Sequence, residues 1–489
     1  MDNSQRLKPG DRIVRPRRIR LHRLRRVLGV AALFSAGYGN VGSSIYYALG
    51  IVALVAMGAT PIVLGVAGIF FIFTALTYAE GTALFPEAGG SASFARHGFN
   101  DTIGFIAGWA LMLSYIVTIA ISAFTIPPYL GYFWEPLKDS PVISTIASMA
   151  IVLFLMTINV IGAKETSIIN IGAAILDIAT QVSLVIIGFI LIFNPTIVWH
   201  RIISNWPTAE NFVFGIALAT IAYTGIETMS QMAEETRQPE RRVPRALILM
   251  IIAVLVIFAG VSLVSLSAMT PDELASDWSR DPVAGIAANL PLVILRNILK
   301  PLIAILAGTI LMIATNAGIM GISRLAFSLG SHRVGPVTLS RVHHRFKTPY
   351  ISIIVFSIVA LIILIPGFFT ANVFENMGAL YAFGSLLAFI FAHASIISLR
   401  IRKPELPRPF KLGCNVRIKG YELPLTCILG LVATAAIWLI ILVTQPYSRW
   451  IGIVWMAIGL IIYYLYRRKQ PAAPDQPPDS PARDGSPHQ

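Results

Sequence analysis

The chain has 489 residues, of which 56% are hydrophobic and only 13% are charged, against about 25% charged in soluble proteins. This composition excludes an ordinary soluble globular protein and indicates a polytopic α-helical membrane protein. The formal net charge of +14 does not point to nucleic acid, because most of the excess lies in tails and short loops. The two cysteines, Cys414 and Cys427, are too few for a disulfide framework or a metal cluster.

Residues 1–26 form an arm rich in lysine and arginine. Such an arm favours a cytoplasmic N-terminus and attracts anionic lipid, and nucleic-acid binding is the less favoured interpretation. The apolar runs after the arm predict twelve membrane-spanning helices. These spans are expected near residues 27–55, 61–85, 102–130, 141–162, 166–193, 210–235, 245–268, 298–329, 350–366, 372–400, 423–444 and 449–467.

The spans form a group of five over residues 27–193, a second group of five over 210–400 and an additional pair over 423–467. Five helices per group invert the topology of the second group, which predicts a pseudo-two-fold axis in the membrane plane. Lysine and arginine are concentrated on one side of the spans, so both termini are expected in the cytoplasm of a plasma (inner) membrane protein. The Pro-rich tail over 468–489 is expected to be disordered.

The first span of each group contains a segment that disfavours a helix. In the first span, Gly42, Ser43 and Ser44 follow two other glycines, and each glycine weakens a helix by roughly 1 kcal/mol relative to alanine. An interruption at mid-depth would free N–H groups for an anionic ligand, although glycines at close helix contacts would also explain these residues. The sixth span is interrupted between Thr220 and Glu227, and matching interruptions in both groups favour a transporter site.

Several sequence blocks resemble the amino acid–polyamine–organocation (APC) permease family, which has the LeuT-like fold. The blocks, in the family's order, are VGSSIY at Val41–Tyr46, YAEGTALFPEAGGSASF at Tyr78–Phe94, NVIGAKET at Asn159–Thr166, YTGIETMSQMAEETRQPERRVPRA at Tyr223–Ala246, SRLAFSLGSHRVGP at Ser323–Pro336 and RKPELPRPFK at Arg402–Lys411. The resemblance implies a 5+5 inverted repeat with discontinuous helices 1 and 6 plus two extra C-terminal helices. It also implies proton- or cation-coupled transport of an amino acid or related amine by alternating access.

The resemblance further implies where the substrate binds. It places the α-carboxylate of an amino acid at Gly42, Ser43 and Ser44, although Ser44 stands where the family often has glycine and would tighten the pocket. The ammonium group is expected at backbone carbonyls beside the second interruption, near Ile221, Ala222, Thr224 and Gly225.

Other residues beside this site have two interpretations each. Ile221 stands where some relatives carry an aromatic gate, which mildly favours apolar or small amino acids over arginine or agmatine. Tyr223 would serve gating or packing. Ser114 and Thr118 would line the pocket or bond to carbonyls of their own helix.

Two carboxylates at membrane depth are candidates for coupling, because a charge there is costly unless it has a function. Glu227 could exchange a proton near neutral pH, with a structural hydrogen bond as the alternative. Asp177 shares a polar helix face with Asn170 and Gln181, at a place where proton-coupled relatives can carry lysine. It would carry a proton, help to bind Na⁺, or anchor a neighbouring helix. Other ligands for such an ion are expected from the Val41 carbonyl, Thr315 and Asn316.

Charged residues at the cytoplasmic ends of the spans are expected to form gates and salt bridges, namely Glu80, Glu87, Glu234, Glu235, Arg237 and Arg324. No hydrolase or P-loop motif is present, so an enzyme is disfavoured and no catalytic residue is expected. No metal site or cofactor is expected beyond a bound H⁺ or Na⁺. The alternative function is transport of K⁺ on the same fold. The expected partners are a small amino acid or amine and the lipid bilayer, not nucleic acid, and the oligomeric state is left open.

Overall fold

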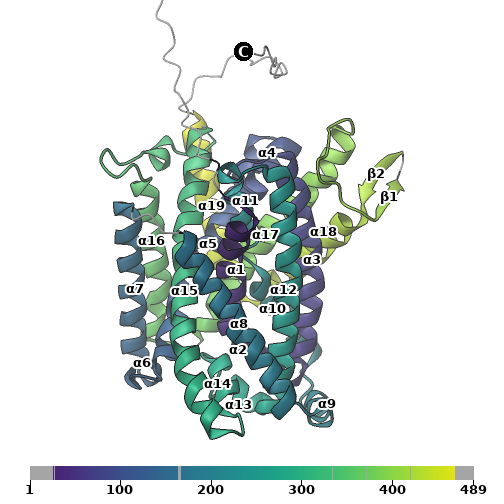
Figure 1. The fold of residues 1–489 in the computed structure, drawn as a ribbon. Helices are drawn as coiled ribbons and strands as arrows, with labels where there is room; N and C mark the ends of the chain where they lie inside the picture. The colour runs from purple at the N-terminus through teal and green to yellow at the C-terminus, as the bar shows by residue number, and fades with distance from the viewer. Residues whose placement is uncertain are drawn as a thin grey trace, which may run out of the picture.

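The computed structural model describes Arg26 and residues 28–468, apart from 163–166, 333, 371 and 419, and it describes residues 167–170 by their backbone only. The remainder of the expected basic arm, the expected tail after residue 468 and the side chain of Asn170 lie outside the described residues. Figure 1 shows a bundle of long helices that run roughly side by side.

The described elements are mainly helices. The longer ones are α1 (Val30–Val41), α2 (Ile45–Ala56), α3 (Thr60–Leu84), α5 (Asp101–Leu130), α7 (Pro141–Ile161), α8 (Ser167–Leu191), α10 (Ala209–Ala219), α12 (Pro239–Ala268), α15 (Val293–Ser331), α16 (Tyr350–Leu364), α17 (Val373–Arg402), α18 (Leu425–Thr444) and α19 (Pro446–Arg468). The shorter ones are α4 (Ser91–Gly98), α6 (Pro136–Asp139), α9 (Pro195–Ser204), α11 (Glu227–Gln231), α13 (Pro271–Ala275) and α14 (Pro282–Ala288).

Six short 3₁₀ segments and one hairpin complete the described secondary structure. The 3₁₀ segments are η1 (Gly42–Ser44), η2 (Met57–Ala59), η3 (Thr220–Tyr223), η4 (Ala233–Glu235), η5 (Val337–Ser340) and η6 (Ile365–Phe368). Strands β1 (Asn415–Ile418) and β2 (Tyr421–Pro424) pair antiparallel, with Val416 opposite Leu423.

Eleven helical stretches of the described residues are long and apolar enough to cross a membrane. The first, Val30–Leu84, has 55 residues. As one straight helix it would measure about 80 Å, whereas the hydrocarbon layer is about 30 Å thick. It is interrupted at η2, where Met57 has a φ of 47°, and α2 and α3 pack against each other on either side.

Polar caps determine where several crossings begin, because a side-chain oxygen there accepts from an otherwise unpaired N–H. Asn100 caps α5 by accepting from Ile103. Thr208 likewise accepts from the N–H of Asn211 and fixes the start of α10.

Burial distinguishes central from peripheral helices. In α5, 89% of the most apolar window is buried inside the protein, compared with 17% in α19. Helix α5 packs against α4, α7, α15 and α17. Large apolar side chains such as Ile190, Val443 and Trp450 face outward, as a lipid-facing surface requires.

The two ends of the bundle carry different elements (Figure 1). We call one end the α4 end; it bears α4, the hairpin and the last turn of α19. We call the opposite end the α13 end; it bears α6, α9, α13 and α14.

Candidate functional site

The first predicted span, formed by α1, η1 and α2, is less interrupted than its sequence predicts. We call it the first crossing. Gly42 has helical backbone angles, with φ −64° and ψ −33°, and its N–H donates to the carbonyl of Tyr38. The hydroxyls of Ser43 and Ser44 donate to the carbonyl of Asn40, at 3.0 and 3.4 Å. The expectation of an unwound segment with a free Gly42 N–H is therefore wrong for this conformation, because a 3₁₀ turn and local hydroxyls satisfy the backbone.

Close packing accounts for some glycines of the first crossing. A Cβ at Gly37 would clash with the side chains of Met229 and Met250, and one at Gly42 would clash with the ring of Tyr38. The interpretation as a close contact between helices is thus confirmed for Gly37, whereas Gly42 contacts Tyr38 of its own crossing.

The sixth predicted span, formed by α10, η3 and α11, is broken. We call it the second crossing. After η3, Thr224 is extended, with φ −77° and ψ 157°, and Gly225 has a φ of +109°. The N–H of Gly225 donates to the carboxylate of Glu227 at 3.0 Å, so Glu227 caps the broken end from inside a fully buried site. Any residue other than glycine at 225 would adopt a strained backbone and press its Cβ against Asn40. The interruption expected here is confirmed.

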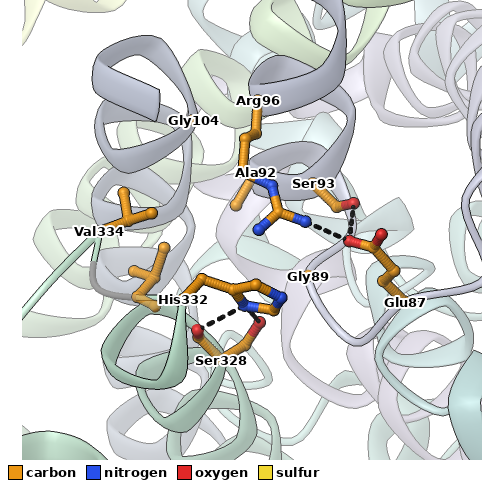
Figure 2. Close-up of a pocket in the computed structure, with 10 residues that line it drawn as sticks. Glu87, Gly89, Ala92, Ser93, Arg96, Gly104, Ser328, His332 and Val334 are labelled. Atoms are coloured by element: carbon orange, nitrogen blue, oxygen red, sulfur yellow. Dashed lines mark hydrogen bonds and ion pairs between the residues drawn. The ribbon is translucent and has the colours of Figure 1, made fainter. Parts of the chain in front are cut away.

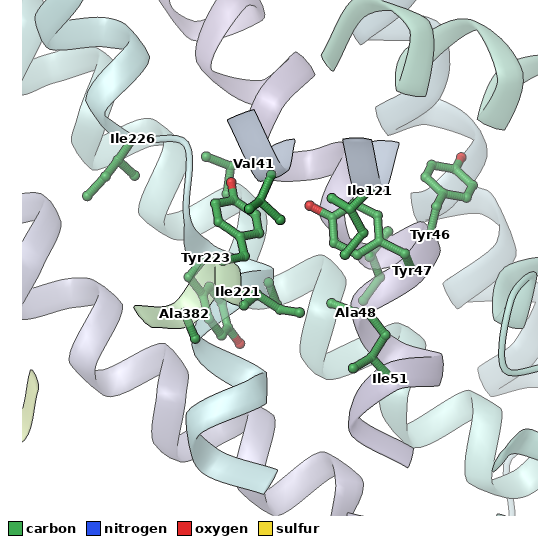
Figure 3. Close-up of a cluster of buried hydrophobic side chains, with 14 of the residues drawn as sticks. Val41, Tyr46, Tyr47, Ala48, Ile51, Ile121, Ile221, Tyr223, Ile226 and Ala382 are labelled. Atoms are coloured by element: carbon green, nitrogen blue, oxygen red, sulfur yellow. The ribbon is translucent and has the colours of Figure 1, made fainter. Parts of the chain in front are cut away.

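The two crossings meet at these segments. The 3₁₀ turns η1 and η3 contact each other, and the side-chain amide of Asn40 donates to Thr228 at 2.8 Å. Figure 3 shows Val41, Tyr47, Ile221 and Tyr223 gathered around the junction. The expected substrate-binding residues Gly42, Ser43, Ser44, Ile221, Ala222 and Thr224 are all buried there.

Tyrosines surround the junction. The hydroxyls of Ser44 and Tyr47 lie 2.9 Å apart, and Tyr381 is within reach of Thr118 and Thr224. Tyr223 donates to the carbonyl of Leu64 at 2.8 Å and stacks on Phe71, which ties it to α3.

Several buried polar atoms of α3 and α5 have no hydrogen-bond partner among the described residues. They include the hydroxyls of Tyr78, Ser114 and Tyr115, and both tyrosines interact electrostatically with Glu227. Buried polar groups in proteins are normally paired, so these atoms mark a place where a polar ligand or water would be bound. Thr118 instead donates to the carbonyl of Ser114 at 2.9 Å.

Asp177 lies on α8 and binds both halves of the first crossing. It accepts from Tyr46 at 2.6 Å and from Tyr38 at 3.1 Å, and Gln181 donates to it at 2.7 Å. Tyr38 and Tyr46 flank the 3₁₀ turn on either side. The sequence interpretation missed both tyrosines; their spacing of eight residues, about two helical turns, was the available signal.

The structure does not bring Thr315 and Asn316 into the hydrogen-bond shell of Asp177. Thr315 donates to the carbonyl of Leu311 at 2.8 Å, and Asn316 accepts from Asn159 on α7. The Na⁺ site expected from these residues with the Val41 carbonyl is not assembled around Asp177 in this conformation. Within the described residues there is also no group of three or more His, Cys, Asp and Glu placed to hold a metal.

Ion pairs close the α4 end, where gate residues were expected. Arg324 pairs with Glu235 at 3.0 Å, and Glu234 accepts from the N–H of Ala88 at 3.0 Å. Leu28, just before α1, forms a parallel bridge with Thr236, so the start of the first crossing is held against the end of the second.

Glu87 organises the loop before α4. It accepts from Ser93 at 2.9 Å and pairs with Arg96 and His97; Figure 2 shows Arg96 and Ser93 reaching Glu87 beside Ser328 and His332 of α15. Burial alone would raise the pKa of Glu87, but the bonds from His97 and Ser93 and the charge of Arg96 outweigh it and lower the pKa from 4.5 to about 2.

Glu80 forms a buried ion pair rather than a surface gate. Arg400 of α17 donates to both of its oxygens, at 2.9 and 2.7 Å, and the N–H of Leu412 donates at 2.9 Å. Both side chains are almost completely buried. The pair therefore fastens α17 and the segment after it to α3.

Comparison with known proteins agrees with this architecture. A family model described as amino acid permease matches residues 28–465. A branched-chain amino acid permease of Bacillus subtilis (strain 168) is 28% identical, over 91% of this chain and 94% of that protein. A methylthioribose transporter of the same organism is 25% identical over 91% and 94%, and a low-affinity putrescine importer of Escherichia coli (strain K12) is 26% identical over 86% and 88%. The chain is therefore a multi-pass membrane protein that belongs to the amino acid permease family of the APC superfamily.

Proposed function

We propose that the protein is a secondary active transporter that moves an amino acid or a related amine across the plasma membrane by alternating access. The observation that carries this proposal is the broken second crossing at Thr224–Gly225, buried against η1 of the first. At the break, the N–H of Gly225 donates to the Glu227 carboxylate and the Ile221 carbonyl accepts from the Thr224 hydroxyl, so side chains hold backbone groups that a ligand would bind in their place. The relatives that transport branched-chain amino acids and putrescine support the same substrate class.

The fold supports a topology of twelve crossings. Dividing Val30–Leu84 at Met57 gives two crossings in place of one. In the 5+5 inverted repeat, α10–α11 is then the broken member, and α1–α2, joined by the 3₁₀ turn η1, is the crossing that corresponds to it. The α4 end is the cytoplasmic end, because it carries Arg96, Arg237 and the Arg400–Lys411 cluster. The ion pairs there hold the cytoplasmic side closed.

Substrate binding would rearrange the first crossing. The ammonium group would bind the carbonyls near Ile221 and Ala222, where η3 contacts η1. For a carboxylate to bind at Gly42–Ser44, the serine hydroxyls must leave the Asn40 carbonyl and the turn must open. Asp177 of α8 accepts hydrogen bonds from Tyr38 and Tyr46 on the two sides of this turn. The turn can therefore open only when these hydrogen bonds lengthen or α8 moves with it.

Asp177 is the residue we propose for coupling. As a carboxylate it accepts charge-assisted hydrogen bonds from both tyrosines, which are about twice as strong as neutral ones. Protonation of Asp177, or a cation bound to it, would weaken these two hydrogen bonds and favour opening of the η1 turn between α1 and α2. Uptake by Asp177→Asn should lose the dependence on pH or Na⁺ that the wild type shows, and an unchanged ion dependence would remove Asp177 from the mechanism.

A binding screen tests the site itself. Purified protein would be heated with each amino acid and with common diamines, and a ligand of the proposed class should raise the melting temperature. The Thr224→Ala variant should show a smaller shift relative to its own ligand-free melting temperature, which itself falls because the buried Thr224 hydroxyl no longer bonds to the Ile221 carbonyl. If no amino acid or amine shifts the wild-type protein, the proposed substrate class is wrong.

A further inference from the structure

A second pocket lies at the α13 end, away from the junction of the two crossings. It has a volume of about 260 Å³ and lies between α2, α10, α17 and the link from α18 to α19. Its polar lining comprises Glu210, Asn211, Glu375, Thr444 and Gln445. This size approaches the lower end of small-molecule pockets, roughly 300 Å³.

The pocket is negatively charged. Glu210 and Glu375 line it from different helices, and neither forms a salt bridge within the described part of the chain. The nearest basic residue along the chain, Arg449, donates to the carbonyl of Leu442 and lies over the ring of Trp450. Lys138, also at this end, is paired with Asp281. Glu210 is exposed and Glu375 is half-buried, and both line the space that a cation would enter.

A single apolar layer separates this pocket from the junction. One helical turn deeper, α17 places Gly378 where a Cβ would lie 3.4 Å from both Ile51 and Ile221. Figure 3 shows Ile221 beside the part of α2 that carries Ala48 and Ile51. The next turns bring Tyr47 and Tyr381, which border Ser44 and Thr224. The pocket, the apolar layer and the junction thus follow one another along α2, α10 and α17.

We propose that this pocket is an outer station that binds the ammonium group of the substrate before the apolar layer opens. This inference rests on the proposed transport function. The pocket binds small cationic amines most strongly, zwitterionic amino acids less strongly, and repels anionic ones. Thr444, Asn211 and Gln445 supply neutral partners for the remaining polar groups of the ligand. The contact of α17 at Gly378 with Ile51 and Ile221 closes the route below the bound ligand.

A cysteine reporter tests the charge of the pocket without requiring transport. In a Cys414→Ser background, Asn211→Cys would be modified with a cationic trimethylammonium-ethyl and an anionic sulfonatoethyl methanethiosulfonate. We expect the cationic reagent to be favoured by about tenfold over its preference at a control Ser204→Cys, which is exposed on α9 at the same end. The preference should fall to the control value in Glu210→Gln/Glu375→Gln, and millimolar putrescine should slow the reaction. A ratio at Asn211→Cys equal to that at Ser204→Cys, or one that survives the double substitution, would overturn the inference.

Transport kinetics separate this inference from the proposed function. In proteoliposomes the double variant should raise the KM for putrescine about tenfold with little change in maximal rate, whereas Glu135→Gln, an exposed carboxylate elsewhere at this end, should leave KM unchanged. If the wild type transports amines and neither KM nor the reporter responds to the two glutamates, the outer station is wrong and the proposed function stands. If the reporter responds but the wild type transports no amine or amino acid, the proposed function is wrong and the pocket is an ammonium site only.

Discussion

The hydroxyl of Tyr46 donates to the carboxylate of Asp177 at 2.6 Å, and this bond joins α8 to the second half of the first crossing. Tyr38, on the first half, donates to the other oxygen of the same carboxylate at 3.1 Å. One acidic side chain therefore holds both sides of the η1 turn. If Asp177 carries the coupling ion, as we propose, this position links that ion to the shape of the substrate site.

Tyr46→Phe should weaken this link more than Tyr38→Phe, because the Tyr46 bond is shorter. Loss of a hydrogen bond to a charged group costs about 1.5–3 kcal/mol. We expect a lower melting temperature in detergent and slower uptake for Tyr46→Phe. Tyr132→Phe, an exposed tyrosine, is the matched control. Equal behaviour of the Tyr46 and Tyr132 variants would show that the Asp177 bond has no energetic role.

Gly225→Ala should abolish transport. Its φ of +109° is strained for alanine, and a Cβ there would collide with Asn40, so a cost of about 1–3 kcal/mol is expected. Gly172→Ala is the control, because nothing lies within 4 Å of its added Cβ and alanine favours a helix. Melting temperature and uptake would be measured for both variants. Normal uptake by Gly225→Ala would contradict the role assigned to the break.

Arg400→Met should destabilise the protein strongly, since it leaves the Glu80 carboxylate buried without its main partner. Breaking one side of a buried pair costs about 3–5 kcal/mol. The double variant Glu80→Gln/Arg400→Met should recover much of that loss. Lys411→Met, which breaks a half-exposed pair with Glu422, should cost less than about 1 kcal/mol. Chemical denaturation in detergent would compare the three, and a double variant no better than Arg400→Met alone would refute the assignment.

The Glu87 cluster should hold α4 in place throughout the physiological pH range. The pKa of Glu87 is lowered from 4.5 to about 2, so its stabilising effect is complete above about pH 4.5 and is lost as the pH falls through about 2. The melting temperature of Glu87→Gln should therefore lie below that of wild type throughout pH 5 to 8, because Arg96 and Ser93 bond to the Glu87 carboxylate at every pH in that range. The gap should shrink only in stronger acid. A gap that closes between pH 7 and 5 would show that another group controls this loop.

The sequence predicted the helices well because long apolar runs leave few alternatives in a membrane. It also located the second break, since a glycine among Thr, Tyr and Glu in the middle of an apolar run disfavours a continuous helix. The first crossing was harder to predict, because glycine occurs both where a helix is interrupted and where a helix packs closely against a neighbour. Gly37 and Gly42 lie at close contacts with Met229 and Tyr38, and the backbone there stays hydrogen-bonded as a 3₁₀ turn.

The partners of Asp177 could not be predicted from local pattern. Its helical spacing with Gln181 identified a polar face, but Tyr38 and Tyr46 reach it from another crossing more than a hundred residues away. The same holds for His393, which is buried on α17 beside Thr74 and Thr77 of α3. Contacts of this kind depend on how helices pack.

Uptake into proteoliposomes tests the central claim most directly. Labelled branched-chain amino acids and putrescine would be compared with ⁸⁶Rb⁺, a tracer for K⁺, in vesicles with wild-type protein and in empty vesicles. The account predicts saturable uptake of at least one amino acid or amine and no uptake of ⁸⁶Rb⁺ above the empty vesicles. Saturable ⁸⁶Rb⁺ uptake with no uptake of any amino acid or amine would contradict it.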